Sequence, residues 1–160
     1  METYVKVTST EKKEIYKEII PQINALLEGE SDVVANLGNV AAVLKMAFPS
    51  ISWVGFYLRK QDELVLGPFQ GKPACVRIKW GKGVCGTAAA KKETVVVPNV
   101  HEFPGHIFCD PESKSEIVVP LIRNAEVLGV LDVDSNQFNS FDEVDREYLE
   151  RLANYLVNLF

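Results

Sequence analysis

Three cysteines are the residues of this sequence with the clearest capacity for chemistry. The three cysteines, Cys75, Cys85 and Cys109, are too few among 160 residues for the disulfide framework of a small secreted protein. Their odd number would also leave one of them unpaired. In a reducing compartment they begin as thiols. Three thiols on irregular or element-terminal positions fit a redox cycle in which one thiol attacks and another resolves.

The surroundings of the cysteines differ from those of a small buried thiol that serves only packing. Cys85 lies in the run Gly-Lys-Gly-Val-Cys-Gly-Thr (81–87), at the first turn of a predicted short helix. The helix dipole and the unpaired backbone N–H groups there favour a thiolate. Cys109 follows His106, a candidate activating neighbour, by three residues in a polar loop, and Cys75 lies at the start of a predicted strand.

Carboxylates form a second chemical group. In the predicted strand Val-Leu-Asp-Val-Asp (130–134), Leu131 and Val133 point to one face, and Asp132 and Asp134 point to the other. Glu116, at the start of the neighbouring predicted strand, adds a third acid. Carboxylates placed side by side repel one another, so the pattern indicates a cation or a shared proton between them, unless they form an ordinary solvated sheet edge.

Aromatic residues are predicted to form a wall beside these acids. Ile51, Trp53, Gly55 and Tyr57 share one face of a predicted strand, on which Trp53 and Tyr57 offer a surface for a small ligand. A tryptophan is more often a core residue, which is the competing interpretation of Trp53.

A zinc site is a rival interpretation of the loop residues. His101, His106 and Cys109 have the spacing His-x4-His-x2-Cys, which matches half of a zinc site. The repeated ligand pairs of a structural zinc site are missing from the sequence, and Cys75 and Cys85 lie on different elements. We therefore expect no metal and no other cofactor.

These side chains require elements that position them. A helix is predicted from a capping box of Thr8 and Glu11, with Pro21 kinking it and Gly29 ending it. Capping signals and helical spacing predict further helices after Asp32, at 84–92 and after a capping box of Ser140 and Glu143. Strands are predicted at 51–58, 63–66, 75–80, 94–97, 116–122 and 126–134, the first two as an antiparallel hairpin.

The expected architecture is α+β: one domain over 1–160 with a mainly antiparallel sheet, the terminal helices packed on one face and the pocket on the other. The aperiodic loop 98–114 is long enough to be functional, and its first part is expected to close over a ligand.

Composition limits the classes of function. Hydrophobic residues make up 47% and charged residues 24% of the chain, which fits a folded soluble protein rather than a disordered one. The net charge of −5 has the wrong sign for a nucleic-acid or anionic-membrane partner. Because the charged N-terminus lacks the apolar core of a signal peptide and no apolar stretch has the length of a membrane span, we expect a cytoplasmic protein.

Six segments carry a resemblance to a known family. They are Trp-Val-Gly-Phe-Tyr (53–57), Gly-Pro-Phe-Gln-Gly (67–71), Gly-Lys-Gly-Val-Cys-Gly (81–86), Val-Pro-Asn-Val (97–100), Cys-Asp (109–110) and Val-Leu-Asp-Val-Asp-Ser (130–135). Together they resemble the free methionine-(R)-sulfoxide reductases, which are compact GAF-domain enzymes. The match covers nearly the whole chain, with the family's separations of 10 residues between Cys75 and Cys85 and 24 between Cys85 and Cys109.

The resemblance implies a role for each candidate residue. Cys109 would attack the sulfoxide sulfur and become a sulfenic acid, and Cys75 or Cys85 would condense with it into a disulfide that thioredoxin reduces. Cys75 is favoured, because Cys85 is tied to a helix start. By similarity, the substrate-binding residues are the aromatic wall and the three acids: Trp53, Tyr57, Glu116, Asp132 and Asp134.

The main alternative is a non-catalytic GAF module that senses a small molecule or the redox state, because most GAF domains are ligand-binding modules. That alternative predicts affinity without turnover. The family is commonly dimeric, so the terminal amphipathic helices are also expected to pair two chains in a homodimer.

Overall fold

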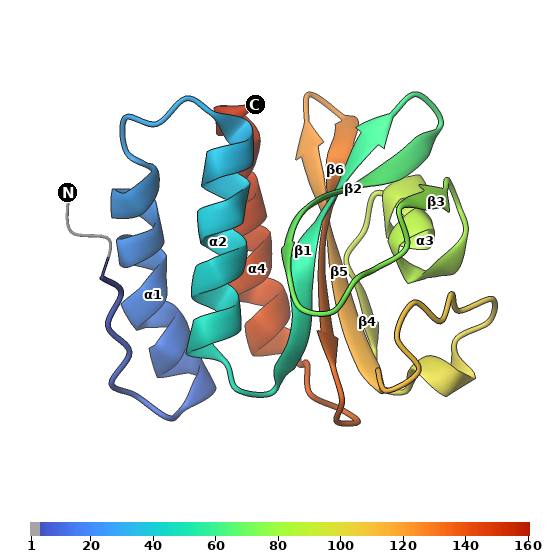
Figure 1. The fold of residues 1–160 in the computed structure, drawn as a ribbon, viewed down its shortest axis with the longest axis horizontal. Coiled ribbons are helices and arrows are strands. Elements are labelled where there is room, and N and C mark those ends of the chain that lie inside the picture. Colours follow the sequence, from blue (N-terminus) through green and yellow to red (C-terminus); the bar gives the residue numbers. More distant parts are fainter. Residues whose placement is uncertain (1–3) are drawn as a thin grey trace.

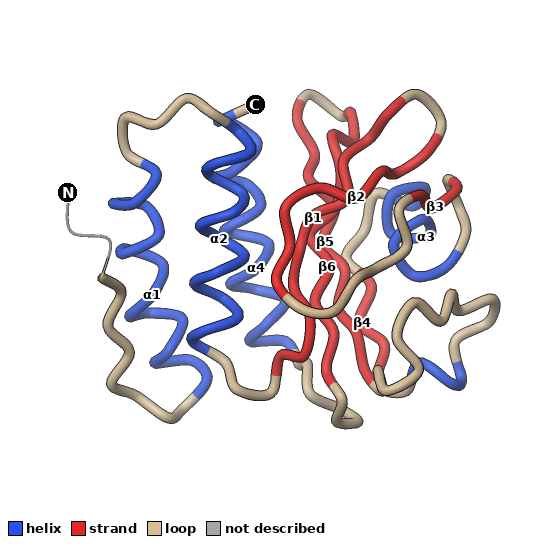
Figure 2. The backbone as a smooth tube through the Cα atoms, in the orientation of Figure 1, coloured by secondary structure: helices blue, strands red, loops and turns tan. Residues whose placement is uncertain are grey.

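The fold is a six-stranded antiparallel sheet with helices on both faces (Figures 1 and 2). The structure is a computed structural model that describes residues 4–160. The strands, in the spatial order β3-β2-β1-β6-β5-β4, have the bounds β1 Ile51–Lys60, β2 Glu63–Gln70, β3 Arg77–Lys79, β4 Val95–Val97, β5 Ser115–Arg123 and β6 Glu126–Ser135. The two longest hairpins, β1–β2 and β5–β6, are joined through β1 and β6 at the centre of the sheet.

Three long helices cover one face, as the sequence predicts. They are α1 (Lys12–Leu27), α2 (Val33–Ala47) and α4 (Glu143–Leu156), and Figure 1 shows all three on the same side of the sheet. Their apolar stripes pack on the inward strand residues to form the main core. The α+β architecture with terminal helices on one face is therefore confirmed.

The first helix begins later than its predicted capping box. Its N-cap is Glu11, whose carboxylate accepts from the backbone N–H of Lys13. The Thr8 hydroxyl instead donates to Glu18, at 2.6 Å. The helix runs through Pro21 and ends at Leu27. A cap at Thr8 was the wrong prediction, because a glutamate ten residues away competes for that hydroxyl.

The cap of the last helix lies two residues beyond its predicted position. Asp142 accepts from the backbone N–H groups of Val144 and Asp145, and the Asp145 carboxylate accepts from the Asp142 N–H. Ser140, the predicted cap, donates to the Ser135 hydroxyl at 2.7 Å. The prediction from Ser140 and Glu143 is therefore wrong, since the serine closes the loop after β6.

The predicted cap of α2 is confirmed. The Asp32 carboxylate accepts from the backbone N–H of Ala35 at 2.9 Å.

The opposite face carries a second, smaller core. The short helix α3 (Gly83–Lys91) packs there on β5 and β6, next to the loop from β4 to β5, which opens with a 3-10 turn at Val100–Glu102 (Figure 1). The predicted third strand, 75–80, forms only at Arg77–Lys79, so Cys75 lies in the segment before it. None of the helices among residues 4–160 has the length and apolar character that crossing a membrane requires.

Candidate active site

The pairing of β5 with β6 brings three carboxylates together. Glu116 pairs with Asp134, and Val118 pairs with Asp132, in antiparallel register. Alternation along β6 places Leu131 and Val133 in the helix-side core. Asp132 and Asp134 line a pocket on the other face together with Glu116. Strand parity therefore predicts the orientation of this segment correctly.

Burial makes these acids hold protons. Glu116 and Asp132 are each 5% exposed. Burial raises the pKa of Glu116 to about 8, and the charge of Asp134 adds to the effect. Burial likewise raises the pKa of Asp132 and of Asp134 well above the ordinary aspartate value, with neighbouring acids contributing. The cluster is thus a set of carboxyl groups that retains protons near neutrality.

The aromatic wall lies beside the acids, and β1 supplies it. The Trp53 and Tyr57 rings stack at a centroid distance of 6.0 Å, and both line the pocket. Ile51 does not share their face, contrary to the sequence expectation, because it is buried in the helix-side core. The register with β6 shifts between Ile51 and Trp53, and this irregularity reverses the alternation at the start of β1.

Gly55 leaves the space that the Trp53 ring and Phe69 occupy. It lies between Trp53 and Tyr57 along β1, opposite Asp132 on β6. A Cβ at Gly55 would lie 2.3 Å from the Phe69 Cβ and 2.7 Å from the Trp53 ring. The Phe69 Cβ is fixed to the backbone of β2 and cannot move alone. A side chain at Gly55 would therefore displace β2 or the Trp53 ring.

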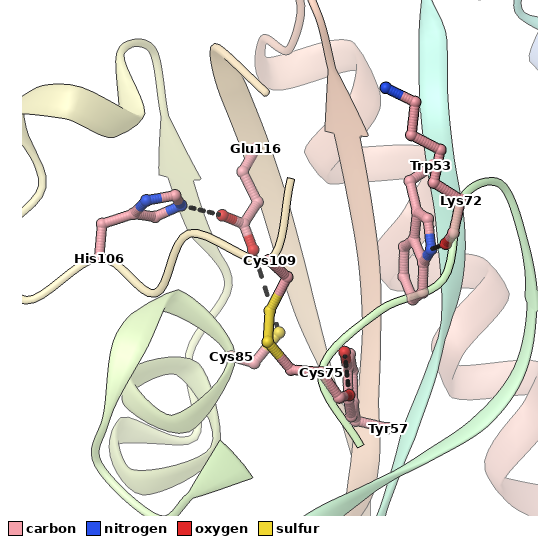
Figure 3. The surroundings of a disulfide bond; sticks show 8 residues. All are labelled: Trp53, Tyr57, Lys72, Cys75, Cys85, His106, Cys109 and Glu116. Carbon is pink, nitrogen blue, oxygen red and sulfur yellow. Dashed lines mark hydrogen bonds and ion pairs between the residues drawn. A yellow bond between two sulfur atoms is a disulfide. The ribbon is translucent and has the colours of Figure 1, made fainter. Parts of the chain in front are cut away.

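A disulfide joins two of the three cysteines at the mouth of this site (Figure 3). It links Cys75, before β3, to Cys109, in the loop before β5, with the two Cα atoms 5.6 Å apart. Cys85 remains a free, buried thiol on α3, and its Sγ lies 4.0 Å from a Glu116 carboxylate oxygen. The structure therefore contains the pairing that the sequence favours.

Cys85 does not have the thiolate character predicted from its place at a helix start. Burial raises the pKa of its thiol well above the ordinary value, and the charges of Asp132 and Glu116 add to this. Removal from water and two nearby acids outweigh the helix dipole, so Cys85 is held as a neutral thiol.

His106 contacts an acid of the pocket. Its Nε2 lies 3.4 Å from a Glu116 carboxylate oxygen (Figure 3). Burial lowers the pKa of His106, which favours the neutral imidazole. Its role as an activating neighbour of Cys109 stays a prediction, because the histidine faces Glu116 here.

Among the described residues, the three side chains of the zinc interpretation, His101, His106 and Cys109, do not come together as a ligand group. Cys109 is bonded to Cys75, and the His101 ring stacks on Phe108. Within residues 4–160, the three candidate ligands whose donor atoms lie within 4.8 Å of one another are Cys85, Glu116 and Asp132. Of these three groups, the Cys85 thiol donates to a Glu116 carboxylate oxygen, with the two atoms 4.0 Å apart.

The aromatic wall also anchors the segment that carries Cys75, a role that the sequence analysis missed. The Trp53 indole N–H donates to the carbonyl of Lys72 at 3.0 Å, and the Tyr57 hydroxyl donates to the carbonyl of Cys75 at 2.9 Å (Figure 3). The two donors tie this irregular segment to β1. No pattern in the sequence signals such a bond, because it joins a side chain to a main-chain group 18 residues away.

The Cys109 loop is held at both ends and along its length. The Val100 N–H donates to the carbonyl of Lys114 at 2.9 Å, which closes the loop at its base. Lys72 forms ion pairs with Asp110 and Glu112. Ser113 donates to Asp134 at 3.0 Å. The loop therefore lies over the carboxylates, and His106, Ile107 and Cys109 line the pocket from this side.

Comparisons with known proteins agree with this geometry. The GAF domain family model matches residues 30–159. GAF domain-containing protein A of Dictyostelium discoideum is 51% identical over 155 residues, covering 96% of this chain and 98% of that protein. The free methionine-R-sulfoxide reductase of Saccharomyces cerevisiae is 49% identical over 150 residues, covering 89% of this chain and 83% of the yeast enzyme. The chain belongs to the GAF-domain free methionine-(R)-sulfoxide reductases.

A solved structure of this reductase family extends the likeness to three dimensions. The free methionine-R-sulfoxide reductase of Neisseria meningitidis, solved in complex with its substrate, superposes with a TM-score of 0.97. It is 50% identical to this chain, and the match covers 99% of this chain and 96% of that one. Family membership and fold are thus established together, and both agree with the resemblance seen in the sequence.

The pocket unites the residues that the sequence singles out for this reductase family. Seven of them line one cavity: Trp53, Tyr57, Cys85, Cys109, Glu116, Asp132 and Asp134. The eighth, Cys75, is bonded to Cys109 at its edge. Lys72, His106, Ile107 and Ser113 also line the cavity and were not named as binding residues. Their position in loops, away from any periodic element, explains why the pattern did not identify them.

Proposed function

We propose that the protein reduces free L-methionine-(R)-sulfoxide to L-methionine through a thiol cycle. The observation that carries this proposal is the Cys75–Cys109 disulfide next to the buried carboxyl groups of Glu116 and Asp132 and the half-buried carboxyl group of Asp134. A sulfoxide reductase needs a nucleophile for sulfur, a proton for oxygen and a second thiol, and the pocket supplies all three. Membership of the reductase family adds independent support.

In the first step, the Cys109 thiolate attacks the sulfoxide sulfur. The sulfoxide oxygen is a poor leaving group until it is protonated, so a carboxyl group with a raised pKa is needed beside it. The carboxyl cluster of Glu116, Asp132 and Asp134 meets that need at neutral pH. The bond from the methionine sulfur to this oxygen then breaks, the oxygen bonds to the Cys109 sulfur and keeps the donated proton, and methionine leaves while Cys109 becomes a sulfenic acid.

In the second step, the Cys75 thiol condenses with this sulfenic acid. The S–O bond breaks, an S–S bond forms, and water leaves with the proton of Cys75. The position of Cys75 favours it for this role, since it is bonded to Cys109 with their Cα atoms 5.6 Å apart, whereas Cys85 is a free, buried thiol on α3. Thioredoxin then supplies two electrons and two protons and restores both thiols.

The acids also account for selectivity toward the free amino acid. An α-ammonium group entering the pocket would pair with an ionised member of the cluster and lower its pKa. A peptide-bound methionine sulfoxide has a neutral amide in place of the ammonium, which leaves the buried carboxylate without its partner. Trp53 and Tyr57 would pack against the methyl-sulfoxide end of the substrate.

The test is NADPH consumption with thioredoxin and thioredoxin reductase, and in parallel methionine release with dithiothreitol. Free R sulfoxide, free S sulfoxide and N-acetylated R sulfoxide are compared. We expect turnover with the free R form alone. Turnover with the N-acetylated form would contradict the role of the acids, and absence of turnover with every form and both reductants would favour a ligand-sensing module.

A further inference from the structure

Exposed apolar side chains flank both cysteines of the disulfide. Val76, which follows Cys75, is 61% exposed, and Phe108, which precedes Cys109, is 58% exposed. The Cα atoms of the two cysteines are 5.6 Å apart and adjacent Cα atoms are 3.8 Å apart, so Val76 and Phe108 have Cα atoms within about 13 Å of each other. Each cysteine of the disulfide thus has an exposed apolar residue as a direct neighbour in the chain.

Further side chains extend this patch. Ile107 is also exposed. The Phe108 ring lies 6.1 Å from the His101 ring, which in turn lies 6.2 Å from the exposed Phe138 ring. We call Val76, Ile107, Phe108 and Phe138 the apolar rim. The other large apolar side chains exposed within residues 4–160 are Tyr4, Val34 and Met46, which belong to the N-terminal segment and α2.

The position of the rim matters because the disulfide must be reduced from outside the chain. The sequence has one further cysteine, Cys85, which is buried and cannot exchange electrons with solvent. An external thiol therefore has to reach a sulfur of Cys75 or Cys109. A small thiol gains nothing from exposed apolar surface, whereas a protein reductant gains binding energy by covering it.

We propose that the apolar rim is the docking surface for a dithiol protein reductant of the thioredoxin type, whose attacking thiol lies within an apolar surface of its own. The inference rests on the proposed function, because it concerns regeneration of the same disulfide. Contact between the two apolar surfaces places the attacking thiolate over the Cys75–Cys109 bond.

The exchange proceeds in two balanced steps. The reductant's thiolate attacks one sulfur of the disulfide, forming a mixed disulfide and releasing the other cysteine as a thiolate that takes up a proton. The second thiol of the reductant then displaces the remaining cysteine and becomes part of an oxidised disulfide. Two electrons pass to this protein, and both of its cysteines end as thiols.

The rim is tested by comparing protein and small-molecule reductants on the same variants. Val76→Ser and Phe108→Ser are assayed at saturating free R sulfoxide, with thioredoxin varied in one arm and dithiothreitol in the other. Met46→Ser is the matched control, because Met46 is 55% exposed but lies on α2. Circular dichroism melting verifies that each variant is folded.

We expect kcat/KM for thioredoxin to fall about tenfold in each rim variant, while dithiothreitol-driven turnover stays within about twofold of wild type. Met46→Ser should leave both arms unchanged. The Phe108 ring lies 4.6 Å from the ring of the pocket residue His106, so if Phe108→Ser lowers both arms equally, the result for Val76→Ser decides. Unchanged kcat/KM for thioredoxin in Val76→Ser, or wild-type turnover with dithiothreitol but none with thioredoxin, overturns the docking proposal. Absence of wild-type turnover with dithiothreitol instead overturns the proposed function.

Discussion

The two faces of the central sheet are built from the same strands but have opposite chemistry. On the helix face, residues such as Leu131 and Val133 of β6 are fully buried among apolar side chains of α1, α2 and α4. On the pocket face, the buried Asp132 and the half-buried Asp134 of the same strand lie beside Glu116. Burying an acid with a raised pKa opposes folding, whereas burying a leucine favours it. The helix face therefore stabilises the fold and offsets the unfavourable burial of acids in the pocket.

Removing the proposed nucleophile, Cys109, should produce the largest effect of any change on the pocket face. Cys109→Ser is expected to reduce turnover by about 10⁴-fold or more, since a hydroxyl cannot replace the thiolate in attack or form the disulfide. Methionine release is measured with thioredoxin and with dithiothreitol. Cys75→Ser is the matched comparison, and it should release one methionine per chain and then stop with thioredoxin. Multiple turnover by Cys109→Ser would show that the nucleophile is another residue.

A truncation on the helix face should lower the stability of the fold and leave turnover nearly unchanged. Leu131→Ala removes a fully buried side chain from the core, and we expect the free energy of unfolding to fall by about 2–5 kcal/mol. Turnover per folded molecule should change little, because Leu131 points away from the pocket. Urea denaturation and the activity below the transition are measured on the same sample. Loss of turnover while the protein remains folded would break the division between the two faces.

Replacing a pocket acid should separate activity from stability. Glu116→Gln removes an ionisable group but keeps the shape, so we expect turnover to fall about 10²-fold, a typical effect of losing a proton-transfer group. The pKa of Glu116 is raised from 4.5 to about 8, so the folded state binds its proton more tightly than the unfolded chain does. The contribution of Glu116 to stability is therefore present in full below pH 4.5 and is lost as pH rises through about 8.

The free energy of unfolding is measured by urea denaturation at pH 5.5 and 8.5 for both proteins. Wild type should lose more stability than Glu116→Gln across this interval, and its turnover should fall as pH rises through the pKa of Glu116. An equal loss of stability in the two proteins would mean that Glu116 is not held protonated in the folded state.

The smallest predicted effect concerns the bond between the aromatic wall and the Cys75 segment. Tyr57→Phe keeps the ring but removes the hydroxyl that donates to the Cys75 carbonyl, a contribution of about 1 kcal/mol. We expect disulfide formation to slow about fivefold in a single turnover, with little change in the rate of methionine release. Tyr148→Phe, on the helix face, is the control and should change neither rate. A slower methionine release with normal disulfide formation would place the Tyr57 hydroxyl in the first step instead.

The sequence predicts features that depend on local geometry. The opposite orientation of Leu131 and Asp132 follows from the two-residue period of a strand, and the structure confirms it. The cap at Asp32 also follows from local chemistry, because a carboxylate two or three residues before free N–H groups accepts from them.

Features that depend on distant partners could not be predicted in this way. The start of α1 shifts because the Thr8 hydroxyl finds Glu18. Ile51 changes faces because β1 is irregular against β6. Cys85 is a neutral thiol rather than a thiolate because α3 buries it beside Glu116 and Asp132, which lie on other strands. In each case a tertiary contact overrides the local signal.

A single turnover without added reductant tests the proposed cycle most directly. The fully reduced protein is mixed with excess free L-methionine-(R)-sulfoxide, and methionine, remaining thiols and the disulfide pairing are determined by mass spectrometry of peptides. We predict one methionine and the loss of two thiols per chain, with Cys75 joined to Cys109 and Cys85 still a thiol. A disulfide that contains Cys85, or disulfide formation without methionine release, would contradict the proposed cycle.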